Sequence, residues 1–294
     1  MALEVAERES RARPRLWLLL GPAFVAAIAY VDPGNVAANL TAGAKYGYLL
    51  VWVLVAANTI AVFVQYQSAK LGIVTGRSLP ELLGSRLGTA GRRAYWAQAE
   101  LVAAATDIAE VIGGAIALNL LFGLPLPLGA LIVGAAAIGI LAVQSRRGQR
   151  PFEAVILALL GVIAIGFLAG LVVSPVDWKA AANGLVPRFD GAPTVLLAAS
   201  MLGATVMPHA IYLHSALARD RHGSSDDAGR VRTLLRATRL DVVLALVLAG
   251  AVNIAMLLLA AAALPGVAGT DTIEGAYAAI GAALGPVVAA VFAI

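Results

Sequence analysis

Cysteine is absent from the 294-residue chain, and charged residues are scarce, making up 13% of the sequence. Without cysteine the protein has no disulfide bond and no metal site built from thiolates. Histidine occurs only three times, and neither a His-Glu-x-x-His nor a Gly-x-Ser-x-Gly motif is present. These absences argue against an intramembrane metalloenzyme. We therefore expect no catalytic residues and no enzymatic activity.

Hydrophobic residues make up 61% of the sequence, and the mean hydropathy is +0.87. Ordinary soluble domains do not have this composition, and repeated apolar runs of about 18 residues or more are typical of membrane-spanning helices. The sequence therefore predicts an all-α integral membrane protein. Its eight apolar runs are residues 16–43, 48–73, 95–122, 127–144, 152–173, 193–217, 240–264 and 274–294.

Arginine and lysine are concentrated in alternate connections between the predicted spans. Of the 21 basic residues, 18 lie in the N-terminal tail or in the connections after the second, fourth and sixth spans. The other connections contain only Lys45, Lys179 and Arg188. By the positive-inside rule, this distribution predicts a cytoplasmic N-terminus and a multi-pass protein of the cell (inner) membrane. The basic connections are interpreted as topology signals and lipid contacts, not as a nucleic-acid interface.

The first apolar run is interrupted by Asp32, Pro33, Gly34 and Asn35. Proline removes a backbone donor and clashes with the preceding turn, and glycine adds freedom, so a helix break is predicted at residues 32–35. A carboxylate in mid-membrane costs about 2.5–3.5 kcal/mol on insertion scales. Broken backbone at that depth is stable only inside protein or beside a watery cavity. An acid at such a break therefore indicates a cation site.

The sixth run has a second interruption, where Pro208 stands between Met207 and His209. Since the first and sixth runs cross in opposite directions, they are typical of an inverted-repeat secondary transporter whose site lies between the breaks. Because two repeats of five spans would need ten, we expect the chain to be a fragment of a longer protein. The predicted parts are a cytoplasmic tail (1–15), a first repeat of five spans (16–173), an extracytoplasmic loop (174–192) and an incomplete second repeat of three spans (193–294).

Asp32-Pro33-Gly34-Asn35 and Met207-Pro208-His209 together resemble the signature of the Nramp family, whose members are proton-coupled transporters of manganese, iron and similar divalent metals. The resemblance extends to Gly21-Pro22 and to the acidic third span, and it covers essentially the whole chain. It implies a LeuT-like inverted-repeat fold with broken first and sixth transmembrane helices, and metal import by alternating access. Mn²⁺ or Fe²⁺ is then the substrate and H⁺ the co-substrate, with no permanently bound cofactor and no obligate protein partner.

The residues at the two breaks offer a mixed set of metal ligands. Asp32 has an anionic oxygen and Asn35 a neutral one, and unwound carbonyls at Ala29 and Ala204 can add further oxygens. Met207 adds a thioether, which favours softer transition ions over magnesium or calcium. The resemblance implies the same ligands, with the two carbonyls joining in particular states. The alternatives are an acid paired with a backbone amide or a lysine, an asparagine that caps the second half-helix, and a methionine that fills a gap in the core.

The third span carries three acids, Glu100, Asp107 and Glu110, whose spacings of seven and three place them on one helical face. Desolvation and mutual repulsion favour protonation of at least one of them, which makes Asp107 and Glu110 candidates for a proton relay. Glu100 is nearer the cytoplasmic end and is interpreted as solvated. His209 can change charge near neutral pH and is the expected proton acceptor beside Asp32, the alternative being a neutral, hydrogen-bonded histidine.

The remaining histidines and a glycine pair are interpreted as structural features. His214 is expected to be structural or to line a vestibule, and His222, in an arginine-rich connection, is expected to be exposed. Gly43-x-x-x-Gly47 predicts close packing between helices.

Two capping boxes are also predicted from local sequence. Ser78 and Glu81 are expected to open a short helix between the second and third spans, and Asp271 and Glu274 are expected to open the eighth.

Two further alternatives stay open at this stage. The same scaffold can carry another solute, such as Mg²⁺ or an amino acid with sodium, and Met207 is the residue that discriminates between these solutes. The chain can also be a transport-inactive fragment, which a comparison of uptake with that of a C-terminally extended chain decides.

Overall fold

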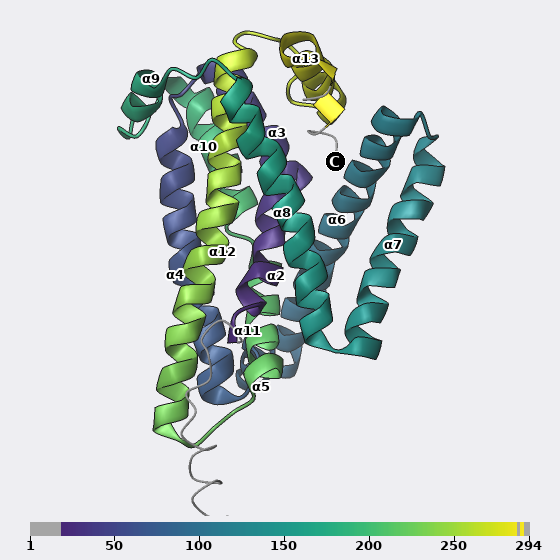
Figure 1. The fold of residues 1–294 in the computed structure, drawn as a ribbon. Helices are drawn as coiled ribbons and strands as arrows, with labels where there is room; N and C mark the ends of the chain where they lie inside the picture. The colour runs from purple at the N-terminus through teal and green to yellow at the C-terminus, as the bar shows by residue number, and fades with distance from the viewer. Residues whose placement is uncertain (1–18, 287–288, 291–294) are drawn as a thin grey trace, which may run out of the picture.

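The computed structural model describes residues 19–286 and 289–290, and within these ranges the chain forms helices and turns but no strand (Figure 1). The predicted tail (1–15), the start of the first apolar run (16–18) and residues 287–288 and 291–294 of the eighth lie outside the described residues. The helices are α2 (Pro22–Ile28), the 3-10 helix η2 (Ala29–Val31), α3 (Pro33–Tyr46), α4 (Val51–Thr75), α5 (Leu79–Arg86), α6 (Thr89–Phe122), α7 (Leu126–Arg147), α8 (Gln149–Val173), α9 (Trp178–Asn183), α10 (Gly191–Thr205), α11 (Pro208–His222), α12 (Ala228–Ala263) and α13 (Ile273–Leu284).

Within the described residues, six helical segments are long and apolar enough to cross a membrane, with α10 and α11 counted as one segment. The segment α2–η2 and helix α13 are apolar but shorter. The prediction of an all-α membrane protein is confirmed. Helices α6 and α12 begin earlier than their apolar runs, because arginine-bearing turns of good helix formers extend them. Helix α9 was not predicted.

The first and sixth helices are both broken, as predicted. In each, proline is the first residue of the second half, where its missing N–H removes no helical hydrogen bond. The first break is narrower than predicted: Asp32 alone is extended, with φ −79° and ψ 169°, and Gly34 lies inside the first turn of α3. Figure 1 shows the two broken helices side by side and running in opposite directions, α2 to α3 upward and α10 to α11 downward.

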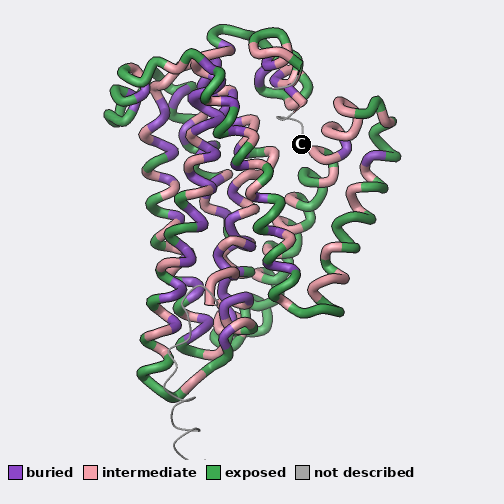
Figure 2. Tube along the Cα trace, in the orientation of Figure 1, coloured by how far each residue is buried: buried purple, intermediate pink, exposed green. Residues whose placement is uncertain are grey.

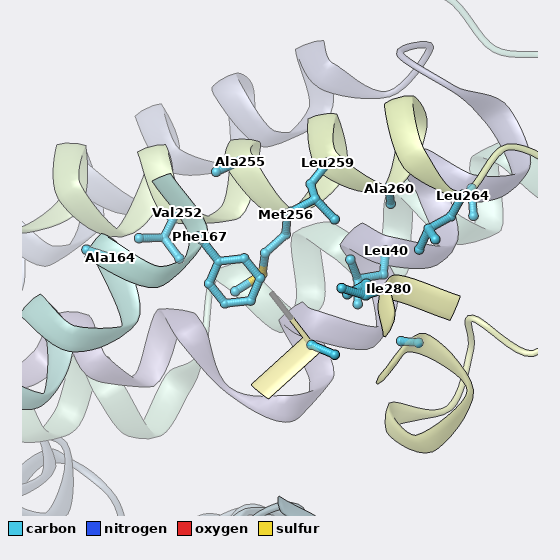
Figure 3. Packing of buried hydrophobic residues seen from close by; sticks show 13 residues of the cluster. Leu40, Ala164, Phe167, Val252, Ala255, Met256, Leu259, Ala260, Leu264 and Ile280 are labelled. Atoms are coloured by element: carbon cyan, nitrogen blue, oxygen red, sulfur yellow. The ribbon is translucent and has the colours of Figure 1, made fainter. Parts of the chain in front are cut away.

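Helix α12 lies at the centre of the bundle and packs against α2, α3, α4 and α8 (Figure 2). Its largest cluster joins Leu40 of α3, Phe167 of α8, Met256 of α12 and Ile280 of α13 (Figure 3). Since lipid is as apolar as these side chains, close van der Waals packing is what holds such helices together. The core is accordingly rich in alanine and glycine.

The glycine pair of α3 acts differently at its two positions. Gly43 lies against the backbone of α12, where a Cβ would collide with the carbonyl oxygen of Leu257 and contact Ala260. The prediction of close packing is therefore confirmed at Gly43. At Gly47 it is wrong: nothing lies within 4 Å of a Cβ there, and the residue ends α3 with φ 58°. A positive φ at a helix end is the other common reason for glycine.

Helices α6 and α7 form a hairpin that stands away from the bundle, largely exposed along its length (Figures 1 and 2). Ala115 and Gly129 are the buried residues within the hairpin and lie against one another. Helix α6 reaches the bundle near Gly113, where a Cβ would lie 2.7 Å from the Cγ of Pro33. This contact brings the acidic helix against the first break.

Two predicted capping boxes have different outcomes. Ser78 accepts from the Glu81 amide while the Glu81 carboxylate accepts from the Ser78 amide, so this box is confirmed. The box predicted for Asp271 and Glu274 is wrong: the Thr272 hydroxyl caps α13 by accepting from the amide of Gly275, at 3.1 Å. Sequence alone did not distinguish the two neighbouring polar residues, because aspartate and threonine are both good caps.

The start of α2 is held by a buried acid from α12. The two carboxylate oxygens of Asp241 accept from the amides of Gly21, at 3.0 Å, and Ala23, at 2.9 Å. Unpaired amides at a helix start favour a negative partner. Asp241 therefore fixes the short first half of the broken helix against the central helix.

Candidate metal site

Asp32 is the cap of α3 and faces Asn35 across the first turn. Its Oδ1 accepts from the backbone amide of Asn35 and from the side-chain Nδ2 of Asn35, both at 2.7 Å. The cap of the second half-helix is therefore Asp32, and the alternative that Asn35 caps it is wrong. The other alternative, in which the acid pairs with a backbone amide, is correct for Oδ1 of Asp32.

The buried Asn35 side chain joins the two breaks directly. Its Nδ2 also donates to the carbonyl oxygen of Ala204, at 2.8 Å, across 169 positions of sequence. Its Oδ1 accepts a long hydrogen bond of 3.4 Å from the hydroxyl of Thr205. Two oxygens proposed as ligands, one from Asp32 and one from Ala204, thus converge on one amide nitrogen.

Met207 lies at the second break, directly before the second half of the broken helix. It is buried, has an extended backbone and precedes Pro208, the first residue of α11. Its side chain belongs to a cluster with Tyr30 of η2, and Ala29 packs against that cluster. The cluster therefore places the thioether of the second break near Ala29 and Tyr30, just before Asp32 in the first break.

The acids of α6 approach the first break from outside the bundle. The negative charge of Glu110 is repelled by those of Asp107 and Asp32. A positive charge on His209 is attracted by Asp32 and Asp107. Glu100 is exposed and lies about 15 Å along α6 from Glu110, at 1.5 Å per residue. Asp107, Glu110 and His209 thus form one group with Asp32, and Glu100 lies apart from it.

The Nδ1 of His209 is buried without a hydrogen-bond partner among the described residues. Buried polar atoms normally have a partner, so an orphaned ring nitrogen needs an explanation. Without a partner, this nitrogen can accept or donate a hydrogen bond to a group that enters the site.

The other histidines have structural surroundings. His214 is completely buried, and its Nδ1 lies 2.8 Å from Oε1 of Gln65, whose Nε2 donates to the Tyr30 hydroxyl at 2.9 Å. The prediction of an exposed His222 is wrong: the residue is only 8% exposed. Helix α11 continues to His222, which places its ring one turn beyond the buried Ala218 and on the same face.

Two functional candidates were missed in the sequence. Thr205 ends α10 and donates to Met201 O at 2.7 Å as well as to Asn35. Asn253 of α12 donates to the carbonyl of Tyr30, at 2.7 Å, and so satisfies an oxygen that the break releases from the helix. The available signal was a polar side chain in the middle of an apolar run. Such side chains are costly inside a membrane, so they usually have a structural or functional role.

No group of three or more histidine, cysteine, aspartate or glutamate side chains is arranged to hold a metal ion in the described part of the chain. The candidate site is different in kind, since it combines one carboxylate with an amide, carbonyls and a thioether.

The comparisons with known proteins decide the family. A family model described as Nramp, "Natural resistance-associated macrophage protein-like", matches residues 23–294. This chain belongs to the Nramp family. The resemblance found in the two break motifs is thereby confirmed.

Relatives and solved structures agree with this assignment. The chain is 60% identical over 291 residues to the divalent metal cation transporter MntH of Mycobacterium tuberculosis strain H37Rv, an alignment that covers 99% of this chain and 68% of the relative. It is 55% identical to MntH of Mycobacterium leprae, covering 95% and 65%. The crystal structure of the Eremococcus coleocola manganese transporter, in complex with an aromatic bis-isothiourea substituted compound, matches with a TM-score of 0.85 and 32% identity, covering 94% of this chain and 60% of that chain. The LeuT-like fold of this Nramp protein is confirmed by that match.

Proposed function

We propose that this membrane protein imports divalent transition-metal ions such as Mn²⁺ or Fe²⁺, coupled to H⁺, by alternating access between the two broken helices. The observation that carries the proposal is the hydrogen bond from Asn35 to Ala204, which ties the two breaks together beside Asp32 and Met207. The names of the relatives, which are metal cation and manganese transporters, support it. They also agree with a protein that is not an enzyme.

The proposed ligands are Asp32, Asn35 and Met207, with the carbonyls of Ala29 and Ala204. In the structure, Asn35 directs its amide nitrogen, not its oxygen, toward Asp32 and Ala204. Since an amide N–H cannot bind a cation, metal binding requires the side-chain amide of Asn35 to turn its Oδ1 toward the ion. Asn35 then has two roles: it ties the breaks together without an ion and is a ligand with one.

The thioether sets the expected selectivity. Mg²⁺ and Ca²⁺ prefer oxygen ligands throughout, whereas sulfur favours Mn²⁺, Fe²⁺ and softer ions by comparison. A buried Met207 at the break therefore disfavours Mg²⁺ as the alternative solute.

Protons are proposed to move through Asp32, His209, Glu110 and Asp107. These four residues interact electrostatically, so a divalent cation arriving at Asp32 makes it less favourable for the neighbouring groups to hold protons. The proton displaced from Asp32 passes to His209 or along the acids of α6. Metal import is then coupled to proton entry, because the proton that the metal displaces leaves through this relay toward the side on which the metal is released.

The orientation follows from the basic connections. A cytoplasmic N-terminus in the cell (inner) membrane is proposed from the positive-inside distribution of arginine and lysine. Residues 16–173 and 193–294 are proposed as the complete and partial inverted repeats, with 174–192 on the outer side.

The test is calorimetric titration of the purified full chain with Mn²⁺, with proton exchange measured in the same samples from buffers of different ionisation enthalpy. Asp32→Ala is expected to abolish Mn²⁺ binding and the proton exchange that accompanies it. The matched control is Asp190→Ala, which removes an exposed aspartate at the start of α10 and leaves binding unchanged. Wild-type Mn²⁺ affinity in Asp32→Ala would contradict the proposal.

A further inference from the structure

A cavity of about 430 Å³ opens at the arginine-rich end of the bundle, between α2, α8 and α12. Its apolar wall includes Leu20, Phe24, Leu157 and Leu244. Leu157 is 42% exposed and Leu244 38% exposed, so the cavity is open sideways, toward the lipid that surrounds a membrane protein. This wall fits a hydrocarbon chain.

At the polar end of the cavity, Arg150 and Arg221 face two acids, Glu153 and the neighbouring Asp241, which holds the amide of Gly21. Glu153 lies there almost buried, and both of its oxygens are engaged: Oε1 accepts from Gln149 at 2.7 Å, and Oε2 lies 3.4 Å from Nε of Arg221. The negative charge is thus matched inside the protein by Arg221. Arg150 is exposed at the same end of the cavity and adds a further positive charge.

The adjoining turn supplies the additional positive charge at this end of the bundle. Helix α7 ends with Arg146 and Arg147, and α8 begins two residues later. Both arginines lie within four residues of Arg150 in sequence and are exposed like it. Basic pockets between transmembrane helices at a membrane surface recognise anionic headgroups, each basic residue contributing about 1 kcal/mol.

We propose that this cavity binds one anionic phospholipid, with its phosphate beside Arg150 and an acyl chain along Leu157 and Leu244. The cavity volume accommodates the glycerol backbone and the upper part of one chain, and the exposed leucines continue the apolar path outward. A zwitterionic lipid fits less well, because its ammonium group would lie near the exposed Arg150. The inference needs only that the protein is embedded in a membrane, and it does not depend on the proposed transport mechanism.

The site adjoins the start of α2. Gly21 and Phe24 line the cavity, and the amides of Gly21 and Ala23 are the groups that Asp241 holds. A lipid seated there contacts the first half of the broken helix and stabilises its packing against α8 and α12.

The experiment is native mass spectrometry of the purified full chain, loaded from mixed micelles with dioleoylphosphatidylglycerol, dioleoylphosphatidylethanolamine or dioleoylphosphatidylcholine. The wild type is expected to retain one phosphatidylglycerol under activation that strips the other two lipids. Its Tm is expected to rise with phosphatidylglycerol, because a ligand that binds only the folded state stabilises it. Arg150→Gln is expected to weaken retention about fivefold. Leu157→Trp, which fills the cavity, is expected to remove it.

The control is Arg188→Gln, an exposed arginine outside the basic connections, which is expected to retain the lipid as the wild type does. Unchanged phosphatidylglycerol retention in Leu157→Trp overturns the proposal, and this variant also decides the matter if Arg150→Gln fails to fold. Equal retention of phosphatidylethanolamine or phosphatidylcholine overturns the anionic assignment. If the chain binds no lipid but forms a dimer that Leu157→Trp abolishes, the cavity is occupied by a second copy of the chain. This result would also overturn the proposal.

Discussion

At the scale of single residues, the candidate site depends on buried polar side chains that are held by specific hydrogen-bond partners. Asn35 uses its nitrogen on Asp32 and Ala204 and its oxygen on Thr205, and Asn253 holds the carbonyl that the first break releases. A buried polar group that loses its partner costs about 1–3 kcal/mol. A substitution here therefore disturbs packing as well as binding, and its test needs a control that separates the two effects.

Met207→Ala is expected to reduce the preference for Mn²⁺ over Ca²⁺ or Mg²⁺ about tenfold, equivalent to about 1.4 kcal/mol, because it removes the only sulfur among the proposed ligands. The measurement is competition of Ca²⁺ or Mg²⁺ with Mn²⁺ binding to the purified chain. Met201→Ala is the control, since Met201 is equally a buried methionine but lies within α10, away from the extended residues. Selectivity that stays the same in Met207→Ala would count against sulfur ligation.

At the scale of helices, local sequence determines where elements begin and end more reliably than it determines their neighbours. Pro33 and Pro208 force their breaks through backbone geometry alone, so both were predictable. The burial of His222 was not, because it depends on how far α11 continues. The contacts of Asn35 and Asn253 were not either, since their partners lie 169 and 223 positions away.

Gly43→Ala is expected to destabilise the protein by about 1–3 kcal/mol, because the new methyl group meets the backbone of α12 and the two helices have to separate. The measurement is the free energy of unfolding in mixed micelles. Gly139 in α7 has open space where a Cβ would lie. Gly139→Ala is therefore expected to be neutral or slightly stabilising, since alanine has a higher helix propensity than glycine. Equal stability changes in the two variants would refute close packing at Gly43.

The short helix α5, outside the spans, gives a pH dependence. The Ser78 amide, followed by the Arg219 guanidinium at 2.6 Å, holds the pKa of the Glu81 carboxyl below its ordinary value of 4.5. A depressed folded-state pKa means that the carboxylate contributes stability above the unfolded-state pKa, and that this contribution disappears as the pH falls through the folded-state pKa.

Thermal unfolding of the wild type and Glu81→Gln should therefore differ at pH 6–7 and converge as the pH falls below about 4. Glu274→Gln, which removes an exposed acid from the first turn of α13 without breaking a capping box, should show a smaller difference from the wild type. A Glu81→Gln difference that grows toward low pH would reverse the sign of the argument.

At the scale of the whole molecule, the first broken helix lies against the long helix α12 and the second lies against α4, while the α6–α7 hairpin stands apart and carries its acids to the first break (Figure 1). Composition and charge distribution predicted the membrane-spanning architecture and the antiparallel breaks. The separation of the hairpin could not be predicted, because apolar side chains are as stable against lipid as they are against other helices.

The central claim is that one ion is held between the two breaks by a carboxylate from the first and a thioether from the second. Anomalous diffraction at the manganese edge, from crystals of the full chain grown with Mn²⁺, tests it most directly. The account predicts a single strong peak within coordination distance of Asp32 and Met207, with Asn35 turned so that its Oδ1 faces the ion. A peak on the acids of α6 alone, with Asp32 and Met207 still in the contacts described here, would contradict it.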